Sequence, residues 1–293
     1  MSVLVADSWR DYEILDAGDG MKLERWGEII LARPDPQVIW GKVRPEMWSK
    51  ADASYKRSTS GGGQWQYNKK FPEKWTINYK NLKFYIEPTG FKHTGLFPEQ
   101  AANWDIMIEA IKKRVSAGQP VKVLNLFGYT GGATVAAASA GASVCHVDAS
   151  KGMVTRAREN VLLSGLDRAE VRYLVDDAFK FVSREIRRGN KYDAIIMDPP
   201  SYGRGPGGEV WKLEDNLWSF VEECAGLLSE NALFFLLNSY TTGLSPVVTG
   251  NILNLLVKRG RGGNVESGDI CIPITSNPNV MLPCGSFARW SAD

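Results

Sequence analysis

The sequence predicts an α/β protein: a doubly wound, mostly parallel seven-stranded sheet with a terminal antiparallel hairpin, preceded by a small β-rich domain. After about residue 90, short apolar segments alternate with amphipathic helical segments, which is typical of parallel βαβ folds. Before that point, six of the ten tryptophans lie among short alternating segments separated by turn residues. The 293 residues suffice for two modest domains. We therefore expect a β-rich domain over 1–90 and a second domain over 91–293.

The first domain is built from short strands and carries an uneven charge. Alternation predicts strands at 12–16, 22–25, 28–33, 38–43 and 75–88, with turns at 16–20, 33–36 and 60–63. The stretch from Lys50 to Lys83 contains eight Lys or Arg residues but only two acidic residues. It also contains six aromatic residues: Tyr55, Trp65, Tyr67, Phe71, Trp75 and Tyr79. Cations attract phosphates and aromatic rings stack on unpaired bases. This stretch is either an RNA-binding surface or a solvated hairpin over a tryptophan-rich core.

The second domain repeats a strand and a helix. A helix at 99–117 precedes apolar strands at 122–127, 143–148, 171–175, 192–198 and 232–238. Helices are expected to begin near Gly132, Lys151, Ala178 and Glu214, and another follows Pro246. Two final strands, 269–274 and 281–290, are joined by a short turn containing Pro278. They predict the terminal antiparallel hairpin.

Composition narrows the class of protein. Hydrophobic residues make up 44% and charged residues 23%, and the net charge is +2. No stretch approaches eighteen apolar residues, and acids at Asp7 and Asp11 interrupt any signal-peptide core, so we expect a cytoplasmic protein without a membrane span. The four cysteines are far apart and there are only two histidines, so neither a metal site nor a disulfide framework is expected.

Glycines follow the first strand of the second domain. Gly128, Gly131 and Gly132 open a strand–turn–helix junction, where backbone N–H groups can approach a ligand. The spacing is not the GxGxxG that seats a pyrophosphate, which disfavours a nicotinamide-dependent dehydrogenase and favours a ligand such as S-adenosylmethionine (SAM). Taken alone, glycines at such a turn can also be purely structural.

Acids end the next strands. Asp148 closes the second strand, Asp177 follows the third, and Asp198 follows the fourth in an Asp-Pro-Pro turn. The carboxyl ends of parallel strands meet at one edge, where open sheets bind ligands. An acid there can accept hydrogen bonds from ribose hydroxyls or an adenine amino group, although each acid alone could be a helix cap.

Together these motifs make the chain resemble class I SAM-dependent methyltransferases, in particular bacterial 23S ribosomal RNA methyltransferases with a small N-terminal β-domain. The resemblance covers about residues 76–290. It rests on segments 94–100 (TGLFPEQ), 124–132 (LNLFGYTGG), 147–150 (VDAS), 177–179 (DAF), 198–200 (DPP) and 282–285 (LPCG). One departure is Ala101, where the family usually has Arg.

The resemblance implies roles for individual residues. The implied SAM-binding residues are Thr94, Phe97, Gln100, Phe127, Gly128, Thr130, Gly131, Asp148, Ser150, Asp177 and Ala178. Those implied to line the transfer site are Asp198, Pro199 and Pro200. Following this turn, a glycine-rich segment is expected to be a mobile loop that contacts substrate through Tyr202, Arg204 and Trp211, with a surface loop as the alternative.

Cysteine placement bears on the chemistry. Relatives that methylate cytosine C5 need a cysteine after the fourth or fifth strand, but Ser201 and Ser239 stand in these segments, and serine ionises far less readily. Cys284, on the terminal hairpin, is interpreted as a core residue. Methylation of nitrogen or oxygen needs only alignment and a proton acceptor.

The leading hypothesis is therefore a methyltransferase that uses SAM to modify a nitrogen or oxygen of an RNA nucleotide, with ribosomal RNA as the expected partner. The alternatives are a methyltransferase for a small molecule or protein, the dehydrogenase, and an idle cofactor-binding domain. The modified atom and the oligomeric state stay open.

Overall fold

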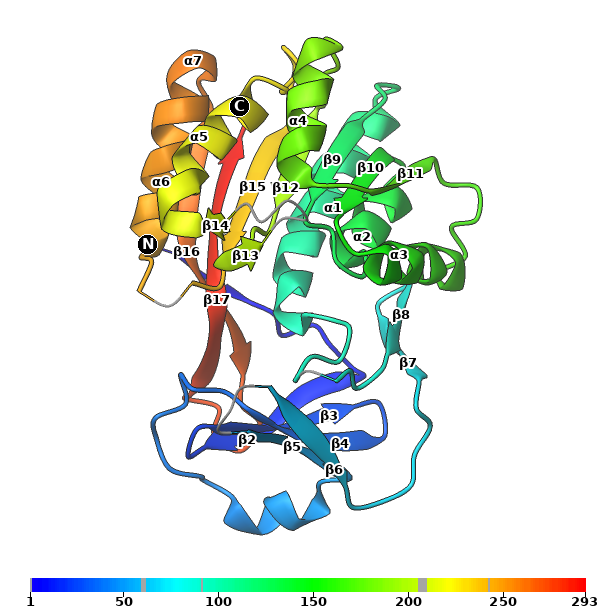
Figure 1. The fold of residues 1–293 in the computed structure, drawn as a ribbon, viewed down its shortest axis with the longest axis vertical. Coiled ribbons are helices and arrows are strands. Elements are labelled where there is room, and N and C mark those ends of the chain that lie inside the picture. Colours follow the sequence, from blue (N-terminus) through cyan, green and yellow to red (C-terminus); the bar gives the residue numbers. More distant parts are fainter. Residues whose placement is uncertain (1, 59–61, 91, 205–209, 242) are drawn as a thin grey trace. The chain divides into compact units, whose positions relative to one another are not determined.

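The computed structural model describes residues 2–58, 62–90, 92–204, 210–241 and 243–293. Its largest sheet has the strand order β1-β16-β17-β15-β12-β9-β10-β11 (Figure 1). The strands are β1 (Ser2–Val5), β9 (Lys122–Leu126), β10 (Ser143–Asp148), β11 (Val171–Val175), β12 (Ala194–Met197), β15 (Phe234–Ser239), β16 (Asn264–Pro273) and β17 (Met281–Ser291).

This sheet has eight strands among the described residues, one more than predicted. The additional strand is β1, which lies beside β16 at the edge of the sheet. Its backbone approaches so closely that a Cβ at Gly268 would lie 1.7 Å from the Ser2 carbonyl oxygen. Four residues are too short a segment to show a period in the sequence, so β1 was missed.

The centre of the sheet is parallel and reverses its winding once. Parallel pairing joins β10 to β9, β9 to β12, and β12 to β15, whereas β15 pairs antiparallel with β17. From β9 the chain adds β10 and β11 on one side, and it then returns to add β12 and β15 on the other side. The order of strands therefore reverses between β9 and β12. In such sheets the crevice outside the carboxyl ends of the two central strands is the usual ligand site.

The helices begin close to the predicted positions. They are α1 (Ala101–Ser116), α2 (Gly132–Ser139), α3 (Lys151–Leu163), α4 (Ala178–Arg187), α5 (Leu213–Ala225), α6 (Pro246–Leu253) and α7 (Arg259–Arg261), with the 3-10 helices η1 (Pro45–Lys50) and η2 (Pro98–Gln100) and the π-helix η3 (Asn254–Lys258). Side-chain oxygens of Ser150, Asp177 and Ser245 accept backbone N–H groups and cap α3, α4 and α6.

Helices cover both faces of the sheet. On one face, buried side chains of α4, α5 and α6, including Phe181, Phe220 and Leu253, pack against strand residues such as Leu126 and Ile195. On the other face, Thr134 of α2 contacts His146 of β10, and Gly132 abuts the ring of Trp104 in α1. This two-sided covering explains the continuous apolar runs of the central strands.

A second compact unit comprises Val5–Ala102 and Cys271–Cys284, while Met1–Leu4, Asn103–Ile270 and Gly285–Asp293 form the first. The second unit contains a five-stranded sheet ordered β2-β3-β4-β5-β6 and a separate hairpin β7-β8. These strands are β2 (Tyr12–Gly18), β3 (Met21–Trp26), β4 (Ile29–Pro34), β5 (Ala53–Arg57), β6 (Gly63–Tyr67), β7 (Trp75–Tyr79) and β8 (Leu82–Ile86).

The second unit is assembled from two distant pieces of chain. The tip of the β16–β17 hairpin runs along β2, where the Thr275 N–H donates to the Ile14 carbonyl at 2.8 Å and the Ser276 N–H to the Leu15 carbonyl at 3.1 Å. The predicted boundary near residue 90 falls inside this unit, and the functional division into 1–90 and 91–293 stays a prediction.

Three local differences from prediction have physical reasons. The predicted strand at 38–43 is irregular: it bonds to the β2–β3 turn, where the Asp19 N–H donates to the Trp40 carbonyl at 2.7 Å. The predicted strand at 75–88 divides into β7 and β8 at Lys80, whose φ is 53°. Strands β5 and β6 were not predicted because cations and glycines dilute their alternation.

Candidate active site

The loop that follows β9 has an unusual backbone. Phe127 and Tyr129 have φ values of 55° and 49°, and Gly131 has a φ of 83°. Left-handed residues other than glycine are strained and persist where the surroundings hold them. Gly128 is required for space, because a Cβ there would lie 2.4 Å from Cε1 of the His146 ring.

A buried polar relay lies beneath this loop. The Asn125 side-chain amide donates to Oγ1 of Thr134 at 2.9 Å, and Oγ1 of Thr134 lies 2.8 Å from Nδ1 of His146. All three side chains are buried, and burial lowers the pKa of His146 to about 4, so the ring is neutral at physiological pH. If the Thr134 hydroxyl donates to Nδ1, the proton resides on Nε2, which has no partner among the described residues.

A second support holds the end of the loop. The buried Asn160 amide of α3 donates to the Thr130 carbonyl at 2.8 Å, and a Cβ at Gly131 would lie 2.7 Å from that of Ala157. Sequence reasoning missed both Asn160 and the Asn125–Thr134–His146 relay. Polar residues inside a strand or helix carry no local signal that distinguishes them from a satisfied core group.

Asp148 ties the loop after β9 to the loop after β10. Its carboxylate accepts the Tyr129 N–H at 2.9 Å and the Ser150 N–H at 2.8 Å. Burial raises the pKa of Asp148 in spite of these two hydrogen bonds. The group is half-buried, and a carboxylate has about four acceptor positions, so it retains capacity for a ligand. Ser150 itself caps α3.

The acids after β11 serve structural roles as well. Asp177 accepts the Lys180 N–H at 2.9 Å as the cap of α4, and Asp176 forms an ion pair with Arg184. Ala178 is buried at the first position of α4. Only one Asp177 oxygen is used by the cap, so the other is available to a ligand.

The Asp-Pro-Pro turn follows β12 at the carboxyl edge of the sheet. Asp198 is half-buried, Pro199 is buried, and the Pro200 carbonyl accepts Nε1 of Trp211 at 2.5 Å. The neighbouring loop after β15 is tied to this turn, because the hydroxyls of Ser201 and Thr241 lie 2.7 Å apart. The turn therefore has a fixed place beside β9, across the reversal in strand winding.

The segment expected to be a mobile loop carries two short paired strands at its described ends. Strand β13 (Tyr202–Arg204) pairs antiparallel with β14 (Val210–Lys212). Tyr202 is 52% exposed, whereas Trp211 is 8% exposed and packs among Phe127, Phe179 and Phe220. A ring so enclosed offers no free face to a base, so its position corrects the role predicted for Trp211. The Arg204 side chain and residues 205–209 lie outside the description.

Three further predicted residues belong to the second unit. Thr94 is completely buried, and its Oγ1 has no hydrogen-bond partner among the described residues. Phe97 is half-buried with its ring centroid 5.5 Å from that of His93, and Gln100 is buried in η2. An unpartnered buried hydroxyl is costly unless a ligand or water satisfies it.

A buried ion pair anchors the start of this segment. Arg33 of β4 donates to both oxygens of Glu24 at 2.5 and 2.6 Å, and its Nη1 donates to the Lys92 carbonyl at 2.9 Å. Burial alone would raise the pKa of Glu24, but the Arg33 guanidinium lowers it to about 2. Burial and the positive charges of Arg33, Lys92 and Lys22 lower the pKa of His93 to about 4. Arg33 thus fixes the backbone two residues before Thr94.

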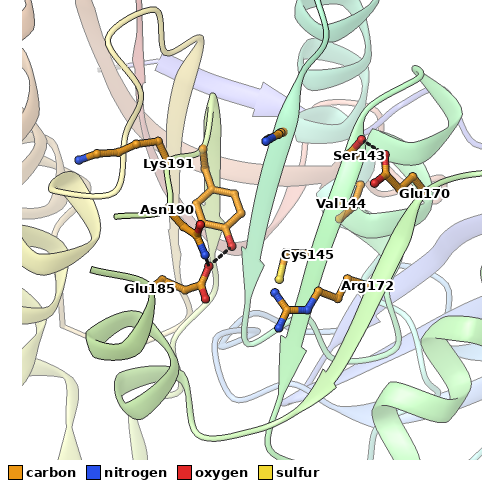
Figure 2. A pocket seen from close by; sticks show the side chains of 10 residues that line it. Ser143, Val144, Cys145, Glu170, Arg172, Glu185, Asn190 and Lys191 are labelled. Atoms are coloured by element: carbon orange, nitrogen blue, oxygen red, sulfur yellow. Dashed lines mark hydrogen bonds between the residues drawn. The ribbon is translucent and has the colours of Figure 1, made fainter. Parts of the chain in front are cut away.

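A separate crevice lies at the opposite, amino-terminal ends of the strands. It has a volume of about 260 Å³ and is lined in part by Cys145, Arg172 and Glu185 (Figure 2). Glu185 is already satisfied, because it accepts the Tyr192 hydroxyl and the Asn190 amide, each at 2.7 Å. None of the predicted site residues lines this crevice.

The described residues offer neither a cluster of metal ligands nor a membrane-spanning helix. No cluster of three His, Cys, Asp or Glu that could hold a metal ion occurs in the described part of the chain. Within the same residues, no helix is long and apolar enough to cross a membrane.

Comparison with known proteins identifies the family. Residues 54–212 match the model for S-adenosylmethionine-dependent methyltransferases. The crystal structure of the SAM-dependent methyltransferase from Agrobacterium tumefaciens is 38% identical, with a TM-score of 0.94, and the match covers 100% of this chain and 94% of that one.

Ribosomal RNA large subunit methyltransferases are also similar. Methyltransferase I of Enterobacter sp. (strain 638) is 34% identical over 130 residues, which cover 43% of this chain and 30% of that protein. Methyltransferase K of Neisseria meningitidis serogroup B is 25% identical over 232 residues, covering 76% of this chain and 64% of that protein. This chain thus spans less than two thirds of these two relatives. By its family match and its similarity to the Agrobacterium structure, the chain belongs to the SAM-dependent methyltransferases.

Proposed function

We propose that the chain transfers a methyl group from SAM to a nitrogen or oxygen atom of a nucleotide in ribosomal RNA. The observation that carries the proposal is the carboxyl edge of the sheet, where the glycine loop, Asp148 and the Asp-Pro-Pro turn flank the reversal in strand winding. In this proposal residues 1–90 recognise RNA and residues 91–293 perform the transfer.

The residues present fit the cofactor. The loop of Phe127, Gly128, Thr130 and Gly131 would lie against it. The N–H groups of Gly128 and Gly131 already donate to the Val147 and Gly128 carbonyls, so these glycines would supply space for the ligand. Asp148 and Asp177 each have acceptor capacity left for ribose and adenine. The proposal keeps Thr94 as a predicted contact of the methionine part. When bound, SAM supplies a methyl group activated by its sulfonium. The proposal gives supporting positions to Phe97, Gln100, Ser150 and Ala178.

Asp198, Pro199 and Pro200 would line the transfer site. The two prolines fix the backbone, and the Trp211 indole holds the Pro200 carbonyl, so the Asp198 carboxylate is presented at a constant position. There it can orient a nucleotide and accept the proton that a methylated nitrogen or hydroxyl loses.

The cysteines support chemistry without a covalent nucleophile. Cys145, Cys224 and Cys271 are buried, and burial raises the pKa of Cys145 to about 11 and that of Cys224 well above its usual value. Burial, assisted by the charge of Glu99, also raises the pKa of Cys284 well above its usual value. Because the thiolate is the nucleophile, these groups are poorly suited to attack a cytosine ring.

RNA as the substrate rests on charge and on the relatives. The stretch from Lys50 to Lys83 holds eight cations and two acids, whereas the whole chain has a net charge of only +2. Such a concentration of positive charge favours a polyanion. The names of the similar curated proteins, ribosomal RNA large subunit methyltransferases, point to the same class of substrate.

The test is to incubate the enzyme with methyl-labelled SAM and ribosomal RNA, and to analyse the nucleosides by mass spectrometry. We expect one labelled nucleoside carrying the methyl group on nitrogen or oxygen, absent with Asp198→Ala. A methyl group on cytosine C5 would contradict the proposed chemistry. Label that appears only in protein or small molecules would instead favour the alternative substrate class.

A further inference from the structure

The aromatic residues between Lys50 and Lys83 fall into two sets. Tyr55 and Tyr79 are 4% and 1% exposed and belong to the core of the second unit. Tyr67, at the end of β6, is 59% exposed, and β6 is the edge strand of its sheet. A ring this exposed on an edge strand is accessible to a binding partner.

Tyr67 is the outer member of a row of three rings. The Tyr67 and Phe71 ring centroids lie 5.6 Å apart, and those of Phe71 and Trp75 lie 5.7 Å apart. The inner end is anchored, because Nε1 of Trp75 donates to the Trp26 carbonyl at 2.9 Å. Phe71 and Trp75 are half-buried, so the row is a supported surface that leaves the Tyr67 ring accessible.

Cations lie along the same segment. Lys70 and Lys74 are exposed between Tyr67 and Trp75, with Glu73 as the one acid of this segment. The Lys74 ammonium lies 4.3 Å from the centroid of the Tyr85 ring, which holds this charge near the surface. Lys69 is partly neutralised by Asp52 at 2.7 Å. The balance of the segment is positive beside an accessible aromatic face.

We propose that the row Tyr67–Phe71–Trp75 binds an unpaired, single-stranded stretch of the RNA substrate, with a base stacked on Tyr67 and phosphates near Lys70 and Lys74. This inference rests on the proposed function and locates its RNA-binding surface. Stacking requires an unpaired base because a duplex buries base faces between neighbouring pairs, and the backbone phosphates supply the complementary charge.

The test measures fluorescence anisotropy of a labelled twelve-nucleotide RNA without self-complementarity, alone and annealed to its complement. For Tyr67→Ala we expect the single-strand Kd to rise about 5-fold to 150-fold, the range expected for one lost stacking contact. Tyr67→Phe retains the ring and should bind within about 2-fold of wild type. Lys70→Ala should reduce the salt dependence of log K by about 0.7, the contribution of one phosphate contact.

Trp218→Ala is the matched control, since Trp218 is a 46% exposed aromatic on α5 in the other unit. It should leave RNA binding unchanged. If Tyr67→Ala folds and binds the single strand like wild type, or if wild type prefers the duplex, this surface is wrong while methylation of RNA stands. If wild type neither binds nor methylates RNA, the proposed function fails and this surface fails with it. Thermal unfolding of each variant separates loss of binding from loss of fold.

Discussion

At the carboxyl end of the sheet, Asp148 accepts two backbone N–H groups and stays half-exposed, whereas at the amino end Glu185 is fully buried and accepts three side-chain donors, Tyr192, Asn190 and Arg188. Asp148 joins the loops after β9 and β10, whereas the partners of Glu185 all lie in the connection between α4 and β12. Asp148 is half-exposed and keeps acceptor capacity that a ligand can reach, whereas Glu185 accepts three donors and is shielded from solvent. Unused hydrogen-bonding capacity, more than the presence of an acid or a crevice, therefore distinguishes a candidate site from a structural one.

The largest expected effect is at Asp198. Asp198→Ala should lower turnover about 10²-fold to 10⁴-fold, the range commonly contributed by a positioned proton acceptor, with SAM affinity nearly unchanged. Steady-state kinetics together with calorimetry of SAM binding measure both quantities. Asp198→Asn, which keeps the shape and loses the charge, separates proton acceptance from orientation. Near-normal turnover in the alanine variant would remove Asp198 from the mechanism.

The relay beneath the glycine loop predicts a loss of stability in acid. The pKa of His146 is about 4 in the folded chain and about 6.5 when exposed, so the unfolded chain binds more protons between these values. The neutral His146 ring contributes about 3 kcal/mol to the free energy of unfolding. This contribution is complete above about pH 6.5 and is lost as the pH falls toward 4.

Urea unfolding across this pH range would measure the loss. His93, whose pKa is also about 4, acts in the same direction in the second unit, so the comparison is with His146→Phe. That variant cannot titrate at this position and should give a flatter dependence on pH. An unchanged slope would mean that His146 is not the group responsible.

Substitutions of Asp148 and Glu185 test the difference between the two ends of the sheet. Asp148→Ala should weaken SAM binding about 10-fold to 150-fold, since a charged acceptor to two hydroxyls contributes about 1.5–3 kcal/mol. Glu185→Ala should leave SAM affinity unchanged and lower the unfolding free energy by about 1–3 kcal/mol, because it leaves the buried Tyr192 hydroxyl without its acceptor. Calorimetry and urea unfolding on both variants would show the crossed effects. The same pattern for both variants would mean that the two ends of the sheet do not differ as inferred.

The sequence identified the parts of the fold that repeat or end in distinctive residues. Helix starts at Gly132, Lys151 and Ala178 agree with the structure because caps and glycine turns are local signals. Strand β1 and the joining of the hairpin tip to β2 depend on pairing between distant segments, which leaves no local pattern.

The same limit of local sequence patterns applies to the candidate site. The acids at strand ends could be placed at one edge because parallel strands share a direction. Trp211 was misassigned because a glycine-rich neighbourhood suggested a loop, although the indole enters the aromatic cluster under the site. The Asn125–Thr134–His146 relay was invisible because its three members come from two strands and a helix.

The smallest expected effect concerns Cys284. Its Sγ lies 3.5 Å from the Leu282 carbonyl, and burial with the charge of Glu99 raises the pKa of the thiol well above its usual value. A cysteine that attacked cytosine C5 would need a lowered pKa and a place in the loops after β12 or β15, where Ser201 and Ser239 stand. Cys284→Ala should therefore keep most of the activity, with a loss of unfolding free energy of about 1 kcal/mol or less. Activity, SAM binding and thermal unfolding of this variant settle the question together. A variant that folds and binds SAM but transfers no methyl group would restore a covalent cytosine mechanism and place the nucleophile on the terminal hairpin.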